Sequence, residues 1–172
     1  MIDRVLDTIA QWLLVIAAIL AFSLCFVVVG DVVGRVFLNH PIQGTPEMVS
    51  GAIVIICYLQ AAYAVRSGGM ISLDALASLM PNRVQTLLAC IGALLGVFLF
   101  GLIFWGSLDQ SVYAWTAGEF DGEGALRIPA WPARFVLTLG SALTAVCYVV
   151  LALKQFNAFI AGEPPVVASS SH

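Results

Sequence analysis

The sequence predicts an all-α membrane protein with four transmembrane helices and a short interfacial helix between the second and the third. Hydrophobic residues make up 61% of the 172 residues and charged residues only 10%, which is more apolar than a soluble protein of this size. The charged residues leave four uncharged runs, at residues 8–30, 48–65, 84–108 and 135–153. The shortest run has 18 residues. As a helix it is about 27 Å long, just enough for a hydrocarbon core of about 30 Å.

Each run is expected to be a helix, because an unpaired backbone group in lipid costs several kcal/mol and the runs lack the alternation of a barrel strand. The approximate spans are residues 8–37, 46–66, 84–108 and 133–154. We assign them to a single four-helix membrane domain, residues 1–153. Residues 155–172 are polar and contain prolines, and we expect them to form a cytoplasmic tail.

The first run is expected to be a retained span rather than a cleaved signal peptide. The segment before it contains Asp3, Arg4 and Asp7 and is therefore not basic, and the run is longer than the roughly 7 to 15 residues of a signal core. Apolar residues already recur at helical spacing before the run. We therefore expect the helix to begin as an interfacial turn, with Trp12 near the lipid headgroups.

The stretch GRVFLNHPIQGTPE, between the first two spans, is expected to form a short structured turn. Asn39 and Pro41 are expected to end the first helix, because the residue before a proline avoids the helical region. Thr45 is expected to cap the second helix, followed by a proline at the first helical position. Glu47 then lies where the positive end of the helix dipole favours an anion.

Two charged residues, Asp31 and Arg35, lie near the end of the first span. They are four positions apart, so they share one face of a helix and are expected to form an ion pair at the membrane surface. The sequence leaves two interpretations open. The pair either neutralises itself near the headgroups, or presents Arg35 to a partner protein.

The stretch RSGGMISLDALASLMP, residues 66–81, is predicted to contain the short interfacial helix. Its glycines suit the end of a helix and its proline breaks one. Between them runs an apolar stripe at helical spacing, formed by Met70, Leu73, Leu76, Ala77 and Met80. Such a stripe is typical of a helix lying in the cytoplasmic interface. The alternative is a solvated loop with incidental hydrophobic residues.

The third and fourth spans contain pairs of small residues that suit helix packing. Gly92 and Gly96 form a GxxxG pair in the third span, and Ser141 and Ala145 form a milder pair in the fourth. Small residues let two backbones approach closely where lipid supplies no hydrophobic driving force. These pairs serve equally well for contacts with a partner subunit and for contacts within the chain.

The distribution of charges predicts the orientation. With both termini in the cytoplasm, four of the seven basic residues lie inside and three outside, which agrees with the positive-inside rule. The loop WTAGEFDGEGALRIPAWPAR, residues 115–134, then faces the periplasm, as do the acidic residues placed before the fourth span. These acidic residues are Asp109, Glu119, Asp121 and Glu123. The loop either is simply solvated or contributes to docking a soluble protein.

Residues that could carry chemistry do not form a recognisable constellation. The four cysteines lie one in each predicted helix, at positions 25, 57, 90 and 147, which argues against a thiol oxidoreductase and predicts buried small hydrophobic residues. Both histidines lie outside the spans, whereas a helix bundle that binds haem needs histidines within its helices. The sequence therefore argues against a haem-binding bundle. All charged residues fall at or beyond the ends of the apolar runs, which argues against a proton-coupled exporter. We therefore expect no enzymatic activity, no metal, no cofactor and no nucleic-acid partner.

The two loops together resemble a known family. The stretch RVFLNHPIQGTPE, followed by an apolar helix that ends in AVRSGGMISLDAL, closely resembles the small membrane subunit of tripartite ATP-independent periplasmic (TRAP) transporters, the DctQ-like family. The resemblance covers residues 34–76 in its motifs and the whole chain in size and number of spans. Two positions depart from the family pattern. Met70 stands where the family often has histidine, and Val36 stands where an aromatic residue is common.

The resemblance implies a non-catalytic permease subunit in the bacterial inner membrane. In such systems a soluble periplasmic binding protein captures an organic acid, and a large elevator-type subunit moves it with a sodium gradient. The small subunit braces the large one, so the implied partners are the large TRAP membrane subunit, the periplasmic substrate-binding protein and membrane lipids. The candidate interface or structural residues are Arg35, Asn39, Pro41, Gly44, Glu47, Arg66, Asp74, Gly92 and Gly96. A free-standing four-helix channel or an assembly factor is the alternative.

Overall fold

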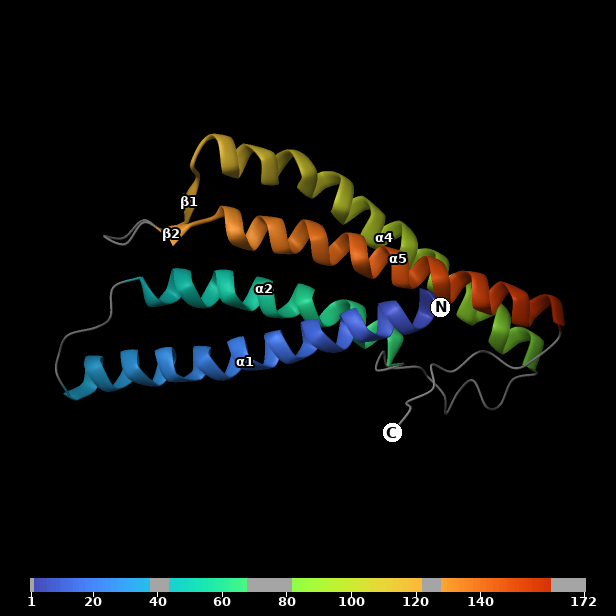
Figure 1. Cartoon of the computed structure of the whole chain (residues 1–172), viewed down its shortest axis with the longest axis horizontal. Helices are drawn as coiled ribbons and strands as arrows, with labels where there is room; N and C mark the ends of the chain where they lie inside the picture. The colour runs from blue at the N-terminus through green and yellow to red at the C-terminus, as the bar shows by residue number, and fades with distance from the viewer. Residues whose placement is uncertain (1, 38–43, 68–81, 122–127, 162–172) are drawn as a thin grey trace.

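The computed structural model describes residues 2–37, 44–67, 82–121 and 128–161. The chain forms four long helices there (Figure 1). They are α1 (Ile2–Phe37), α2 (Thr45–Arg66), α4 (Asn82–Thr116) and α5 (Trp131–Ala161). Each is long and apolar enough to cross a membrane. The predicted all-α fold with four spans is therefore confirmed, whereas the predicted interfacial helix falls at residues 68–81, outside the described residues.

The helices extend beyond the uncharged runs. α4 has 35 residues and is about 52 Å long, well beyond a hydrocarbon core of about 30 Å. Asp109, which we expected in the loop before the last span, therefore lies on α4. The loop also ends earlier than expected, because α5 begins at Trp131 rather than at residue 133. α5 continues to Ala161, past the predicted end of the last span at residue 154.

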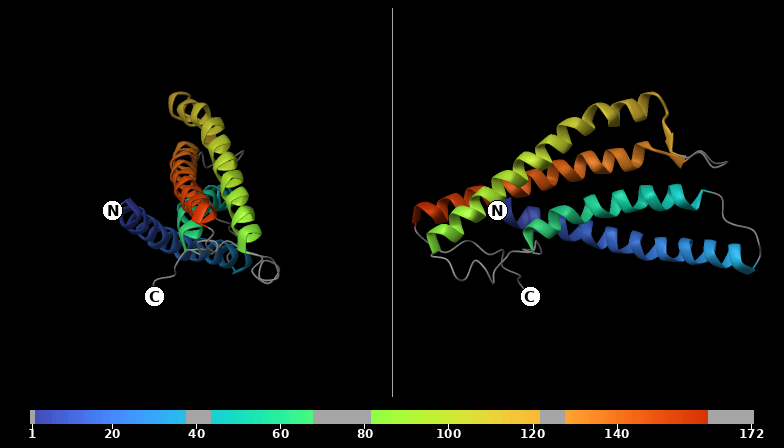
Figure 2. Two further views of the ribbon diagram at one scale, coloured as in Figure 1. Left: turned by 90° about the vertical axis from the view of Figure 1, so that its right-hand side faces the viewer. Right: turned by 180° about the vertical axis from the view of Figure 1, so that it is seen from behind.

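The four helices pack in the order α1, α2, α5, α4. α1 packs along α2, α2 packs along α5, and α5 packs along α4 (Figures 1 and 2). α1 and α4 therefore lie at the two edges of the array, and α2 and α5 lie between them. Burial follows this order, since 39% of the most apolar window of α5 is buried, against 6% in each of α1 and α4. Two hairpins, α1/α2 and α4/α5, thus meet along α2 and α5.

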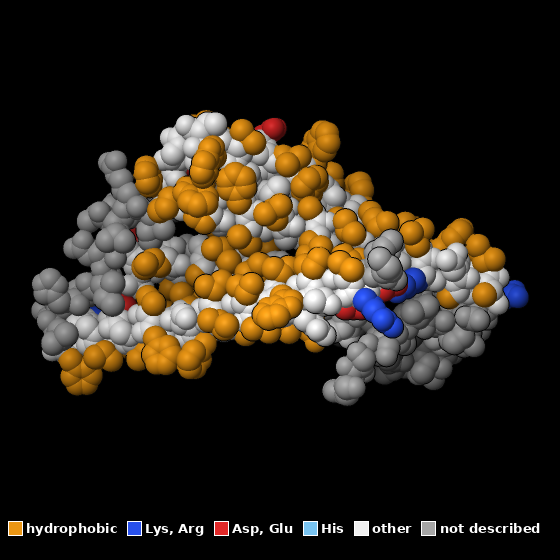
Figure 3. All heavy atoms as spheres, viewed as in Figure 1, with side chains coloured by type: hydrophobic (Ala, Val, Ile, Leu, Met, Phe, Trp, Pro, Cys, Tyr) orange, Lys and Arg blue, Asp and Glu red, His pale blue; other side chains and the backbone are white. Residues whose placement is uncertain are grey.

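The centre of the array is built from small and polar side chains. The largest side chains that are fully buried are Thr86, Thr144, Cys147 and Ser141. Large hydrophobic side chains instead cover the outside, as the hydrophobic surface in Figure 3 shows. This distribution is expected in lipid, where close backbone packing and hydrogen bonds, rather than apolar burial, hold helices together.

The backbones of the two hairpins approach closely at Gly140 of α5. A Cβ atom at this position would lie 2.8 Å from the backbone oxygen of Tyr58 on α2. At Gly96 of α4, a Cβ atom would lie 2.4 Å from the ring of Tyr148. At Gly92 the same atom would meet nothing within 4 Å. Gly140 and Gly96 therefore permit contacts inside the chain, whereas Gly92 faces outward.

The described turns are shaped by two glycines with positive φ. Gly44, at φ 83°, caps α2 and accepts a hydrogen bond from the backbone N–H of Met48 at 3.0 Å. The predicted cap at Thr45 is therefore wrong by one residue, because the left-handed conformation of Gly44 already turns the chain and Thr45 is the first helical residue. Gly118, at φ 60°, follows the end of α4.

A two-stranded ladder joins α4 to α5. β1 (Phe120–Asp121) pairs antiparallel with β2 (Ile128–Pro129), with Phe120 opposite Pro129. The backbone N–H of Ala130 also donates to the carbonyl oxygen of Glu119 at 3.0 Å. The ladder brings the ends of α4 and α5 together, which fixes the side chains at this end of the hairpin.

The cysteines are only partly as expected. Cys147 is buried, and Cys90 is partly buried. Cys25 and Cys57 are exposed on α1 and α2, so the prediction of buried cysteines is wrong for these two. The reason is the open array, in which each helix keeps an outer face that none of the other described helices covers.

Candidate partner interface and the charged ends of the helices

Four charged side chains from three helices meet at the end of the array that holds the N terminus. Asp3 and Asp7 come from α1, Arg66 from the last turn of α2, and Lys154 from α5. We call these four residues the charge clamp. Arg66 Nη2 lies 3.1 Å from Asp3 Oδ1, and Lys154 Nζ lies 2.8 Å from the same oxygen. Arg66 Nε donates to the carboxylate of Asp7.

The charge clamp neutralises itself. Two carboxylates face two cations, so the cluster has no net charge at neutral pH. The Arg66 side chain is only 11% exposed, whereas the two aspartates are about half exposed, at 47% and 50%. Pairing removes most of the cost of holding an arginine near lipid. Arg66, a candidate for partner contact, is therefore engaged within the chain, and a role in an interface stays a prediction.

The charged pair at the far end of α1 is confirmed. Arg35 Nη2 lies 2.9 Å from Asp31 Oδ2. The Asp31 side chain is 8% exposed and that of Arg35 is 62% exposed. Since Arg35 is the exposed member, it can accept a further anionic partner without leaving Asp31. Glu47, half-buried in the first turn of α2, lies at the same end of the α1/α2 hairpin. Asn39, Pro41 and Asp74 lie outside the described residues.

Buried hydroxyl groups hold α4 against α5 near the pocket described next. Ser111 Oγ and Thr138 Oγ1 are 2.6 Å apart, and Thr138 Oγ1 donates to Ser107 Oγ at 3.1 Å. Ser111 Oγ also lies 3.1 Å from the carbonyl oxygen of Arg134, within hydrogen-bond distance. All three side chains are buried. These hydrogen bonds cross between helices, as expected where hydroxyl groups stabilise helix pairs in lipid.

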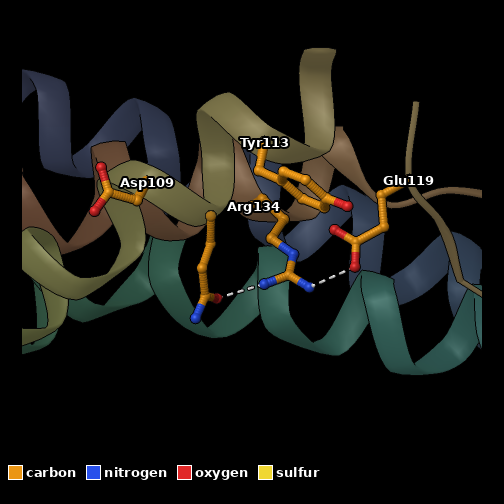
Figure 4. A pocket seen from close by; sticks show the side chains of 5 residues that line it. Asp109, Tyr113, Glu119 and Arg134 are labelled. Atoms are coloured by element: carbon orange, nitrogen blue, oxygen red, sulfur yellow. Dashed lines mark hydrogen bonds and ion pairs between the residues drawn. The ribbon is translucent and has the colours of Figure 1, made fainter. Parts of the chain in front are cut away.

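A shallow polar pocket of about 380 Å³ lies at the ladder end of α4 and α5. It is lined by Asp109, Gln110 and Tyr113 of α4, by Glu119 and by Arg134 of α5. Figure 4 shows the Arg134 guanidinium directed toward the Glu119 carboxylate. It donates to Gln110 Oε1 and, at 3.3 Å, to Glu119 Oε1. Two carboxylates and one guanidinium give the pocket a net charge of about −1 at neutral pH.

Three aromatic rings pack beside this pocket. The ring centroids of Trp115 and Trp131 are 5.3 Å apart in an edge-to-face arrangement, and Phe135 contacts both rings. Tryptophan is enriched where a membrane meets water. An aromatic cluster of this kind suits a position at the depth of the headgroups.

Sequence reasoning missed both the charge clamp and the pocket. Asp3 and Lys154 are far apart in the sequence, and no spacing rule pairs them. The sequence held only a weak indication of the charge clamp. Acidic and basic residues flank the apolar runs on the same predicted side of the membrane. The pocket had a similar weak signal in the sequence, because Arg134 and several acidic residues lie at the two ends of one loop. The two glycines of the predicted GxxxG pair also differ in their surroundings. Gly96 packs inside the chain, whereas Gly92 is exposed.

Comparisons with known proteins give one match. Residues 24–158 match the family of tripartite ATP-independent periplasmic transporters, DctQ component. The matched region includes α2, α4, nearly all of α5 and residues 24–37 of α1. Neither a curated protein nor a solved structure matches the chain. Because the family match covers well over half of the sequence and agrees with four membrane-spanning helices, the chain belongs to the DctQ component family of TRAP transporters.

Proposed function

We propose that the chain is the non-catalytic small subunit of a sodium-driven TRAP transporter for organic acids, in which it braces the large elevator-type membrane subunit. The observation that supports this most is the open helix array. α1 and α4 form its edges, and only 6% of the most apolar window of each is buried in the described structure. An array of this kind occupies a broad area of membrane and offers long lateral faces to a larger protein.

The placement of charge supports a bracing role rather than a transport site. The ion pairs of the described residues lie at the helix ends, where Arg66, Lys154 and Arg35 each pair with an aspartate of the same chain. A binding site for an ion or a carboxylate within the membrane requires polar groups directed at the substrate. Here the charges of these ion pairs are directed at one another.

We further propose a bacterial inner-membrane location with both termini in the cytoplasm. In this orientation the charge clamp lies at the cytoplasmic side, and Arg35, Glu47 and the pocket lie at the periplasmic side. Arg35 and Glu47 then serve as anchors for the large subunit. The acidic loop before α5 helps to dock the periplasmic substrate-binding protein.

Co-purification tests the proposed assembly. The tagged chain is co-expressed with the large membrane subunit encoded beside it, and a stable one-to-one complex is expected after affinity and size-exclusion chromatography. Uptake of the organic acid by cells should be lost when the chain is deleted. Failure to co-purify, together with uptake that survives the deletion, would show that the chain is not a subunit of this transporter.

Substitution of Arg35 and Glu47 tests the anchors. Arg35→Ala and Glu47→Ala should each lower the yield of complex several-fold, since a charged hydrogen bond contributes about 1.5–3 kcal/mol. Arg4→Ala is the matched control, because Arg4 is an exposed arginine near the opposite end of α1. Capture of substrate by the soluble binding protein should stay unchanged in all three variants. Loss of capture would contradict a role confined to the membrane complex.

Docking of the binding protein is tested separately. Replacing Glu119, Asp121 and Glu123 together by serine should raise the concentration of binding protein that gives half-maximal uptake. An unchanged half-saturating concentration would exclude the acidic loop from docking while leaving the bracing role intact.

A further inference from the structure

We propose that the pocket between α4 and α5 binds the headgroup of a phospholipid that carries a primary ammonium group, such as phosphatidylethanolamine. The pocket is formed by Asp109, Gln110, Tyr113, Glu119 and Arg134. The inference does not depend on the proposed transport function, since it requires only that the helices span a membrane.

The depth of the pocket places it among lipid headgroups. α4 is about 52 Å long, whereas a bilayer including its headgroups is about 40–45 Å thick. Asp109 and Tyr113 lie in the last turns of α4, beyond its uncharged run. The aromatic cluster of Trp115, Trp131 and Phe135 marks the same level. A polar hollow at this depth meets headgroups more often than soluble molecules.

The charges of the pocket fit an ammonium group combined with a phosphate. Among the described residues, the Asp109 carboxylate and the Tyr113 hydroxyl make no hydrogen bond or ion pair, and both side chains are exposed. They are four positions apart on α4, so they share one face and are accessible together. A primary ammonium group can donate three hydrogen bonds to such oxygen atoms.

Arg134 supplies the complementary charge. Its guanidinium has five N–H donors, and the hydrogen bonds to Gln110 and Glu119 use two of them within the described part of the chain. Its side chain is 31% exposed. The remaining N–H groups can donate to a phosphate oxygen, which arginine binds with favourable geometry. Gln110 and Glu119 hold the guanidinium in place, so little ordering is required when the lipid binds.

The size and surroundings of the pocket agree with this ligand. A volume of about 380 Å³ lies at the lower end of the roughly 300–1,000 Å³ usual for small-molecule sites, which suits a headgroup rather than a whole lipid. The neighbouring outer face of α4 exposes Leu102, Trp105 and Val112. This apolar face extends from the pocket toward the membrane interior, where the acyl chains of the same lipid would lie.

Native mass spectrometry of the purified full chain tests the proposal. The chain is titrated with phosphatidylethanolamine, phosphatidylglycerol and phosphatidylcholine of the same acyl composition. We expect phosphatidylethanolamine to bind about tenfold more tightly than phosphatidylglycerol, which lacks a cation. Phosphatidylcholine should bind less tightly than phosphatidylethanolamine, because its quaternary ammonium has no N–H donor. Equal binding of the three lipids by the wild-type chain would overturn the proposal.

Variants assign the preference to the pocket. Asp109→Asn should reduce the preference for phosphatidylethanolamine about tenfold, and Tyr113→Phe should reduce it by a smaller factor. Glu47→Gln is the matched control, because it removes a carboxylate at the same end of the array but outside the pocket, and it should keep the wild-type preference. An Asp109→Asn variant that is helical by circular dichroism and keeps the full preference would refute the assignment.

Two other occupants give different results. If free phosphoethanolamine binds as tightly as the lipid, the pocket is a site for a soluble molecule and the lipid proposal is wrong. If Asp109→Asn weakens binding of the periplasmic protein while the lipid preference stays unchanged, the pocket is a protein-docking surface and the lipid proposal is again wrong.

Discussion

The two ends of α5 are held by different chemistry. Near its C-terminal end, Lys154 joins Asp3 and Arg66 in a cluster of full charges that links three helices. Near its N-terminal end, Thr138 joins Ser107 and Ser111 through neutral hydroxyl groups that link α5 to α4 alone. The difference teaches that the α4/α5 hairpin is stabilised by short-range polar packing. The junction between the two hairpins instead combines the charge clamp with the packing of α2 on α5, which includes the approach of Gly140 to Tyr58 and the buried cluster of Ala62, Val65, Cys147 and Tyr148.

The largest effect is expected from filling the space at Gly140. Gly140→Ala places a Cβ atom 2.8 Å from the Tyr58 backbone oxygen, so α2 and α5 must separate. We expect a loss of about 1–3 kcal/mol in stability, measured as a lower Tm of the detergent-solubilised chain. Gly92→Ala is the matched control and should be neutral or more stable by up to about 1 kcal/mol, since its Cβ atom meets nothing. An equal loss in both variants would mean that the two hairpins do not meet at Gly140.

Breaking the charge clamp should have the next largest effect. Arg66→Ala removes the hydrogen bonds to Asp3 and Asp7 and should lower stability by about 1–2 kcal/mol, less than a fully buried pair because the aspartates are half exposed. Arg4→Ala, which removes an exposed arginine at the same end, should change the Tm little. The difference between the two variants should shrink at high salt. If Arg66→Ala and Arg4→Ala had the same Tm, the charge clamp would not contribute to stability.

The residues of these two regions differ in how far the sequence predicted them. The four spans followed directly from the positions of the charges, because lipid excludes charged side chains over the length of a helix. The Asp31–Arg35 pair followed from helical spacing. Helix ends were less predictable, since polar residues continue a helix through the headgroup layer. α4 therefore includes Asp109, and α2 is capped by Gly44 instead of Thr45.

The charge clamp and the pocket were not predictable in the same way. Both combine residues from different helices, and their geometry depends on the order in which the helices pack. No local rule states that α2 packs on α5 or that Asp3 reaches Lys154. The contacts of small residues were equally hard to predict. Spacing alone does not distinguish Gly96, which packs on Tyr148, from the exposed Gly92.

Removing a buried hydroxyl should have a smaller effect. Thr138→Val keeps the shape of the side chain but removes the hydrogen bonds to Ser107 and Ser111. We expect a loss of about 0.6 kcal/mol in stability, the average for hydrogen bonds between membrane helices. Thr116→Val is the control, because the Thr116 hydroxyl is exposed and, among the described residues, donates to carbonyl oxygens of its own helix. In the double variant with Arg66→Ala the losses should add, since the sites are distant. A strong departure from additivity would show that the two ends of α5 are coupled.

The smallest effect is expected at the rim of the pocket. Glu119→Gln weakens the ion pair between Glu119 and Arg134. Both side chains of this pair are about one-third exposed. A change of about 0.2–1 kcal/mol is expected at low salt, and it should vanish at about 1 M salt. A larger, salt-independent loss of Tm would place Glu119 in the core of the hairpin instead of at its surface.

Uptake by proteoliposomes tests the central claim most directly, namely that this chain supports a transporter without transporting substrate itself. Vesicles are prepared with the chain alone, with the large subunit alone and with both, and the organic acid is supplied on its binding protein under a sodium gradient. We expect uptake only when both membrane subunits are present. Sodium-driven uptake by vesicles that contain this chain alone, or full uptake by the large subunit alone, would contradict the account.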